Sequence, residues 1–324
     1  MYKRIKEQSC AKSLLINAVE TNKINHCYIF SGNEGTGRFL LAKEFAKSIV
    51  CKEKSGCNKC IPCKQFSDNT SPDYKVIDLL EEKGKTKKAI TVDQIREVVA
   101  DIYIKPSVFE KKIYIIKNAD KMNINAQNAI LKSLEEPPSY VIFILIVTNT
   151  ELLLPTIVSR GTIVNFTPLT EKTVKEIIKE NYEIDIPDSL LSLSMGSVTE
   201  AYKISISEEH KNIRDEIIKT TLMFFKEKNT VGLLRLYGLI IKYEKEKEFV
   251  FNVINTVIFD IIKKNENADV INKDADYNNI NIKTGQLYDI SNITFELIKR
   301  LNSNIKYNLA VLSALNDIRA VLLG

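Results

Sequence analysis

Gly32-Asn33-Glu34-Gly35-Thr36-Gly37-Arg38-Phe39 has the glycine spacing of the phosphate-binding motif G-x-x-x-x-G-K-[ST]. The stretch follows an apolar run at 27–30 and opens a helical pattern, which is the strand–loop–helix context that the motif requires. Arg38 replaces the lysine that reaches the phosphates, and Phe39 replaces the hydroxyl that holds Mg²⁺. The sequence therefore predicts a nucleotide-hydrolase fold kept for a role other than hydrolysis. We expect the degenerate nucleotide-binding residues to be Gly32, Gly35, Gly37 and Arg38.

Strand and helix patterns alternate around this loop, over the first half of the chain. Apolar runs predict buried strands at 27–30, 74–80, 113–116, 140–148 and 162–166. Helical spacing predicts helices at about 11–22, 37–50, 91–103 and 123–136. Such alternation is typical of an α/β fold with a parallel sheet and helices on both faces. The charged stretch at 81–88 predicts an exposed loop.

The second acidic site of a nucleotide hydrolase is also degenerate in this chain. Such enzymes place an aspartate for Mg²⁺, and often a glutamate that positions water, at the end of a later strand. After the strand predicted at 113–116, Lys117 stands at the metal-ligand position and Asn118 at the base position. Asp120 comes two to three residues too late, and we expect it at the start of the following helix. Two sites degenerate together argue against hydrolysis more strongly than one.

Four of the six cysteines form a cluster with metal-ligand spacing. They follow the pattern C-x5-C-x2-C-x2-C and are Cys51, Cys57, Cys60 and Cys63. Four thiolates on a short excursion can close a tetrahedral shell around structural Zn²⁺, and nearby lysines would favour the thiolate form. An iron–sulfur cluster and four free cysteines are the alternatives, but the chain lacks the C-P ending of a ferredoxin.

Charge and hydropathy restrict where the protein acts. The net charge of +5 arises from 46 basic and 41 acidic residues, which permits nucleic-acid contact without arguing for it. No apolar run approaches 18 residues, and the first residues lack a signal-peptide core. We therefore expect a cytoplasmic protein without a membrane span.

The second half of the chain is predicted to be helical. We expect an α/β domain at 1–166 with the zinc module at about 51–63, a small helical domain at 167–207, and a helical domain at 208–324. A polar interruption falls at 265–284. Helical apolar spacing in the last segment involves Leu297, Ile298, Leu301, Ile305, Leu309, Leu312, Leu315 and Ile318.

Ser159-Arg160-Gly161 precedes the last predicted strand and has two interpretations. Arg160 is either an ordinary surface arginine or an arginine finger, donated together with Ser159 to a phosphate that a neighbouring subunit holds. The second interpretation would explain why a fold without hydrolysis is kept. His26 and His210, the only histidines, lie far apart in the sequence, and we assign them no catalysis.

These motifs together resemble the AAA+ clamp-loader family of bacterial DNA polymerase III, and most closely its delta-prime type. The strongest block is 125–138, NAQNAILKSLEEPP, which is similar to the family signature N-A-L-L-K-x-L-E-E-P-P. Ser71-Pro72-Asp73 resembles the family turn H-P-D, and Ser159-Arg160 matches the S-R of its S-R-C motif, with Gly161 in place of cysteine. The resemblance is strong over 1–200 and looser over 208–324, where the segment 304–310 is similar to N-x-N-x-x-L-A.

The resemblance implies a subunit without ATPase activity of its own. In the ATPase relatives of the gamma/tau type, G-S-x-R carries a sensor arginine, whereas this chain has threonine at that place, Thr199. The family also implies a AAA+ domain with a structural zinc site, a lid and an oligomerising collar. Its partners are gamma/tau and delta subunits, a sliding clamp and primer-template DNA, and its arginine reaches the ATP of the adjacent subunit. The working hypothesis is a clamp-loader subunit that donates Arg160 in trans.

Two other functions remain open from the sequence. One is an active AAA+ ATPase that uses Arg38 and an unrecognised acid, and the other is a zinc-dependent DNA-binding module. The loop amides and the helix N-terminus still suit an anion, so residual nucleotide binding is open as well.

Overall fold

The computed structural model of the chain describes residues 1–68, 70–82, 85–86, 89–301 and 306–324. They form two units, Met1–Leu169 and Thr170–Gly324, each with its own internal packing. The predicted division into three domains stays a prediction. Residues 83–84 and 87–88 of the predicted loop, and residues 304–305 of the predicted C-terminal segment, lie outside the described residues.

The first unit is built on a five-stranded sheet in which all neighbouring strands run parallel, in the order β2-β5-β6-β1-β7. The strands are β1 (Cys27–Ser31), β2 (Tyr74–Ile77), β5 (Lys112–Ile116), β6 (Val141–Val147) and β7 (Thr162–Asn165). All residues of β5 and β6 are buried, as expected for strands covered on both faces. The predicted α/β fold with a parallel sheet is confirmed.

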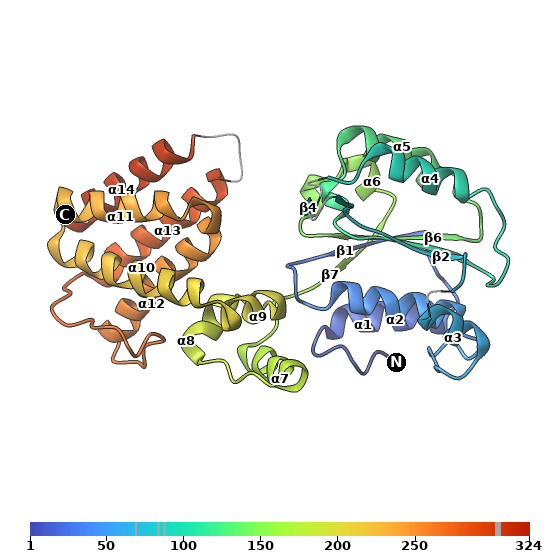
Figure 1. The fold of residues 1–324 in the computed structure, drawn as a ribbon, viewed down its shortest axis with the longest axis horizontal. Helices are drawn as coiled ribbons and strands as arrows, with labels where there is room; N and C mark the ends of the chain where they lie inside the picture. The colour runs from blue at the N-terminus through green and yellow to red at the C-terminus, as the bar shows by residue number, and fades with distance from the viewer. Residues whose placement is uncertain (69, 83–84, 87–88, 302–305) are drawn as a thin grey trace. The chain divides into compact units, whose positions relative to one another are not determined.

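Helices cover both faces of this sheet (Figure 1). On one face lie α1 (Ser9–Glu20), α2 (Arg38–Val50) and α3 (Ile61–Ser67). On the other lie α4 (Val92–Asp101), α5 (Ile124–Glu135) and α6 (Pro155–Val158). The side chains of β1 alternate between the two cores, because Tyr28 and Phe30 pack with α1 and α2 whereas Cys27 and Ile29 pack with α5 and α6.

The sequence prediction was wrong in detail after β2. The strand predicted over 74–80 ends at Ile77, and the predicted loop at 81–88 contains a short antiparallel pair, β3 (Glu81–Glu82) with β4 (Lys85–Thr86). Two 3₁₀-helices also belong to this unit, η1 (Ala119–Lys121) and η2 (Thr150–Leu152). As a result Asp78 leaves the sheet at its edge instead of lying within a strand.

Asp73 explains the turn that the sequence analysis singled out at 71–73. This residue is 2% exposed, and its carboxylate accepts hydrogen bonds from the backbone N–H groups of Ser107, Val108 and Phe109, at 2.6 to 3.0 Å. A buried carboxylate is stable only when it is hydrogen-bonded, and this one also satisfies three backbone donors of the loop before β5. The aspartate is therefore a structural residue of the first unit.

Among the described residues of the second unit, every regular element is a helix. They are α7 (Glu171–Tyr182), α8 (Asp188–Leu191), η3 (Ser192–Ser194), α9 (Val198–Ile206), α10 (Glu208–Glu227), α11 (Thr230–Lys242), η4 (Glu244–Glu246), α12 (Lys247–Asn265), α13 (Thr284–Leu301) and α14 (Tyr307–Leu323). The hydroxyl of Thr170 caps α7 and that of Ser197 caps α9 by accepting backbone N–H bonds three residues on. None of the described helices in the chain is long and apolar enough to cross a membrane.

The polar segment between α12 and α13 is tied to the helices by buried polar groups. Asp260 of α12 is fully buried and accepts hydrogen bonds from the backbone of Asn272, at 2.9 Å, and from the hydroxyl of Tyr277, at 2.6 Å. Arg214 of α10 pairs with Asp274 at 2.7 Å. Burial and the Asp260 carboxylate raise the pKa of Tyr277, so its hydroxyl stays protonated as a donor. The polar residues of this segment therefore hold it against α10 and α12.

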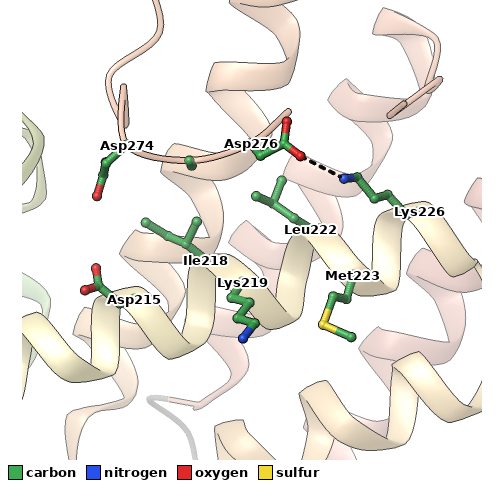
Figure 2. A pocket seen from close by; sticks show the side chains of 9 residues that line it. Asp215, Ile218, Lys219, Leu222, Met223, Lys226, Asp274 and Asp276 are labelled. Carbon is green, nitrogen blue, oxygen red and sulfur yellow. Dashed lines mark hydrogen bonds and ion pairs between the residues drawn. The ribbon is translucent and has the colours of Figure 1, made fainter. Parts of the chain in front are cut away.

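A pocket of about 410 Å³ lies where this segment crosses α10 (Figure 2). Its carboxylates are already engaged, since Asp215 and Asp274 both pair with Arg214, and Asp276 pairs with Lys226. The pocket is thus a gap between paired side chains and gives no sign of a ligand site.

Candidate functional site

The glycine-rich loop lies at the carboxyl edge of the sheet, directly after β1. Gly35 and Gly37 have φ of 75° and 92°, the left-handed region that glycine adopts without strain. At Gly32 a side chain is excluded sterically, because an added Cβ would lie 2.6 Å from the carbonyl oxygen of Phe166. The three predicted glycines therefore fix the path of the loop into α2.

Arg38, the first residue of α2, is turned inward. It is 9% exposed, and its Nη1 donates to the carbonyl oxygen of Val147 at the end of β6. Burial lowers the pKa of the guanidinium, and the nearby carboxylates of Asp120 and Glu34 offset part of that shift. The group at the phosphate-binding lysine position thus ties the start of α2 to the end of β6.

Phe39 and Lys117 occupy the two positions where a hydrolase would hold magnesium. The ammonium of Lys117 lies 4.9 Å from the centroid of the Phe39 ring, within the range of a cation–π contact. The same ammonium forms an ion pair with Asp78, which also accepts a 2.7 Å hydrogen bond from Asn118. A cation of the protein itself therefore lies beside the residue that replaces the metal-binding hydroxyl.

Two acids, Asp78 and Asp120, follow strands at this edge, and each accepts hydrogen bonds, although Oδ1 of Asp120 is buried without a hydrogen-bond partner among the described residues. Asp120 lies in η1, and its carboxylate accepts hydrogen bonds from the backbone N–H of Thr148, at 2.8 Å, and from the Thr148 hydroxyl. Burial raises the pKa of Asp78, but hydrogen bonds from Lys117, the Leu79 N–H and Asn118 bring it below its usual value. Asp78 was missed in the sequence because the apolar run at 74–80 was interpreted as one strand.

Arg160 lies at the opposite, amino edge of the sheet. It precedes β7, which runs parallel to β1 with Tyr28 opposite Thr162, whereas the glycine-rich loop follows β1. Its side chain is 32% exposed, and the guanidinium donates from Nη2 to Glu135, at 2.9 Å, and from Nη1 to the Thr156 carbonyl, at 2.7 Å. Four residues of parallel strand span roughly 13 Å, so Arg160 and the glycine-rich loop with Arg38 lie at opposite edges of the sheet.

Gly161 has a packing reason to replace the cysteine of the S-R-C motif. A Cβ at this position would lie 2.6 Å from both Cγ1 and Cδ1 of Ile29 and 3.4 Å from the sulfur of Cys27. Both neighbours are completely buried in β1. The chain therefore passes over β1 at a separation that only glycine permits, immediately after Arg160.

The four clustered cysteines converge on one point, with their sulfur atoms within 4.8 Å of one another. Four ligands at 2.3 Å around Zn²⁺ would place the sulfurs roughly 3.8 Å apart, so the donor set fits a tetrahedral site. Backbone N–H groups point at the sulfurs, with Cys57 N donating to Cys51 and Cys60 N to Cys57, both at 3.4 Å. Cys51, Cys57, Cys60 and Cys63 can therefore hold a metal ion.

The thiolate form of Cys51 is favoured mainly by the backbone. Burial raises its pKa, but N–H groups of Cys57, Ser55 and Glu53 donate to the sulfur and bring the pKa down to about 6. The lysines that we expected to favour thiolates are not among these causes. Phe66 of α3 anchors the module to the sheet through its ring contact with Tyr74, at 4.0 Å between centroids.

Comparison with known proteins identifies the family. The profile of the family described as "DNA polymerase III, delta subunit" matches residues 7–170, half of the chain. This chain is a member of that family. It accordingly belongs to the AAA+ clamp-loader family and is delta-prime-like.

Curated relatives include more than one type of clamp-loader subunit. The chain is 32% identical to the delta' subunit of Bacillus subtilis over 208 residues, which cover 64% of this chain and 61% of that protein. It is 28% identical to the gamma/tau subunit of Mycoplasma genitalium over 358 residues, covering 100% of this chain and 57% of that protein. The chain thus spans about three fifths of the length of these relatives.

A gamma-subunit-related structure from Thermotoga maritima aligns with 95% of this chain and 99% of that chain, at 18% identity and a TM-score of 0.41.

Proposed function

We propose that this clamp-loader family member is a delta-prime-type subunit that hydrolyses no ATP of its own. The observation that supports this most strongly is the arrangement at the carboxyl edge. Arg38 is bound to the strand end, and Lys117 lies between Asp78 and the Phe39 ring. Mg²⁺-ATP would need a hydroxyl and an acid for the metal at those positions, and it would meet an aromatic ring and a cation instead.

The second part of the proposal is that Arg160 acts on a neighbouring subunit. Arg160 and the glycine-rich loop belong to opposite edges of one parallel sheet, so this arginine is not placed to serve its own loop. A third of its side chain is exposed, which leaves the guanidinium accessible to an anion from another chain. An arginine donated in this way stabilises charge on the transferred phosphoryl group and accelerates hydrolysis by about 10³ to 10⁵.

The partners follow from these two parts. The chain would assemble in the cytoplasm with gamma/tau-type and delta-type subunits, and the complex would load a sliding clamp onto primer-template DNA. The predicted lid at 167–207 and collar at 208–324 would be the parts that join it to the other subunits. The four cysteines would hold structural Zn²⁺, which has no open position for catalysis when four protein thiolates bind it.

The test is ATP hydrolysis by the complex reconstituted with gamma/tau and delta partners, stimulated by primed DNA. Arg160→Ala is expected to lower hydrolysis at the adjacent site about a thousandfold while assembly, followed by size-exclusion chromatography, stays intact. Arg96→Ala is the matched control, because Arg96 is another exposed arginine of the first unit with a carboxylate partner. An unchanged rate for Arg160→Ala would refute the donation in trans.

One observation favours a second candidate, an ATPase subunit of the gamma/tau type. The relative from Mycoplasma genitalium that matches the whole length of this chain is a gamma/tau subunit. That function requires stoichiometric Mg²⁺-ATP binding and turnover by the isolated chain. The positions of Phe39 and Lys117, where such an ATPase would bind magnesium, argue against this second candidate.

A further inference from the structure

Glu135 binds the arginine that the proposed function uses. It is the last residue of α5, a helix that begins after the carboxyl end of β5 and returns to the amino edge of the sheet. Its Oε1 accepts the Nη2–H of Arg160 at 2.9 Å, and the backbone carbonyl of Thr156 accepts Nη1–H at 2.7 Å. The guanidinium is therefore held by two acceptors that come from two different helices.

We propose that Glu135 is a positioning residue, which fixes the Arg160 guanidinium before a neighbouring subunit presents its phosphate. This inference rests on the proposed action of Arg160 in trans. An arginine side chain has several rotatable bonds, and ordering it at an interface costs free energy at the moment of assembly. The contact between Arg160 and Glu135 already orders the arginine in the isolated chain. The free energy of ordering is therefore spent on folding and not on assembly.

The geometry leaves the guanidinium able to bind a second anion. It carries five N–H donors, of which Nη1 uses its donors on Thr156 and on the Ser159 hydroxyl, at 2.7 and 3.4 Å. Nη2 donates once, to Glu135. Among the described residues no acceptor binds the Nε–H or the second Nη2–H, so two donors remain for an incoming phosphate oxygen.

Because Glu135 is exposed to water, its negative charge repels that phosphate only weakly. The carboxylate side chain is 48% exposed, so water screens its repulsion of another anion. An exposed ion pair is also weak enough to adjust when the phosphate arrives. The pair can therefore orient Arg160 without sequestering it.

The experiment uses the reconstituted complex and compares Glu135→Gln with Glu136→Gln in this chain. Glu136 is the next residue, is also exposed, and makes no ion pair among the described residues, so it controls for the loss of one negative charge. We expect Glu135→Gln to lower the DNA-stimulated kcat about fivefold, with KM for ATP unchanged. Glu136→Gln should have no effect, and Glu135→Asp should restore part of the rate.

Two further readouts separate positioning from a structural role. In the Arg160→Ala background, Glu135→Gln should cause no additional loss, because the two residues act through one contact. In the isolated chain, ¹⁵N relaxation of the Arg160 side chain should show a more mobile Nε in Glu135→Gln than in the wild type, with an unchanged melting temperature.

The outcomes distinguish this inference from the proposed function. If Arg160→Ala lowers hydrolysis and Glu135→Gln does not, the positioning role is overturned and the arginine finger stands. If Glu135→Gln raises hydrolysis, Glu135 restrains Arg160 and the inference is wrong in sign. If Arg160→Ala itself has no effect, both the proposed function and the role of Glu135 fail.

Discussion

The arginines at the two edges of the sheet, Arg38 and Arg160, differ in burial and in hydrogen bonding. At the carboxyl edge Arg38 is nine-tenths buried and donates to a backbone carbonyl, while Asp120 accepts hydrogen bonds from Thr148, and Asp78 from Lys117 and Asn118. At the amino edge Arg160 is held by exposed acceptors and remains 32% exposed. The same residue type thus serves folding at one edge and is available for binding at the other.

Under the proposed function, this difference would let a nucleotide-hydrolase fold lose one activity and keep another. At the carboxyl edge Arg38, Lys117 and Asp78 are bound to groups of the chain itself, where a hydrolase would bind its nucleotide and metal. The amino edge needs no nucleotide of its own, because its arginine would act on a phosphate from elsewhere. The two edges can therefore be tested separately, by stability measurements for one and by assembly and turnover for the other.

Metal removal should have the largest effect on stability, and it should fall on the helix that Arg38 begins, at the opposite end from Arg38. Helix α2 runs from Arg38 to Val50 and leads directly to Cys51, so losing the metal would release the C-terminal end of that helix. With the metal at about 1,000 times its Kd, removal costs about 4 kcal/mol. Chemical denaturation with and without a zinc chelator measures this, and hydrogen exchange should rise in α2 more than in α6. Equal stability after complete metal removal would contradict a structural metal.

Arg38→Ala should lower the free energy of unfolding by about 3 kcal/mol, because it removes a buried charged donor, leaves the Val147 carbonyl without that donor and takes a positive charge away from the neighbourhood of Asp120. Arg160→Ala should change it by less than about 1 kcal/mol, since its ion pair with Glu135 is exposed. Urea denaturation of the two variants gives both values. Equal losses would remove the distinction between the two edges.

Gly161→Ala tests whether the close approach beside Arg160 is necessary. The new Cβ would lie 2.6 Å from the buried Ile29 side chain, and overpacking of this kind costs about 2 kcal/mol. Gly238→Ala is the matched control, because Gly238 lies in α11 with nothing within 4 Å of an added Cβ. It should stabilise the protein by about 0.5 kcal/mol. A neutral Gly161→Ala would mean that the backbone before β7 moves easily.

The smallest effect expected is a pH dependence at the carboxyl edge. The folded pKa of Asp78 is lowered, so its pairing contributes stability above the unfolded pKa of about 3.9 and loses it as the pH falls through the folded pKa. Because Asp78 is a third exposed, the contribution is about 1 kcal/mol at most. Asp78→Asn should flatten the stability profile between about pH 5 and pH 3. An identical profile in the variant would show that another group carries the dependence.

Much of the first unit could be predicted from the sequence because its strands are continuous apolar runs. The five strands of the sheet and the four long helices were predicted near their observed bounds. Asp78 was missed because an apolar run shows where burial continues and not where the chain leaves the sheet. The helix α3 was missed because Ile61–Ser67 is short and lies among metal-ligand cysteines, whose spacing dominates the pattern.

The chemistry of the candidate site could be predicted only in part. The spacing of the glycines and of Cys51, Cys57, Cys60 and Cys63 identified the loop and the metal cluster, because both are local in sequence. The contacts of Arg38 with Val147, and of Arg160 with Glu135, join residues 109 and 25 positions apart. Such pairings depend on strand order, which the local pattern does not contain.

The central claim is that the glycine-rich loop at the carboxyl edge binds no Mg²⁺-ATP. Titration of the isolated chain with Mg²⁺-ATP by calorimetry tests this claim most directly. Wild-type protein should show no saturable binding at millimolar nucleotide, and Arg160→Ala should behave in the same way, because Arg160 belongs to the other edge. Stoichiometric binding with turnover would contradict the account. It would mean that Arg38 and Lys117 leave their partners to admit a nucleotide, and that this chain is an ATPase.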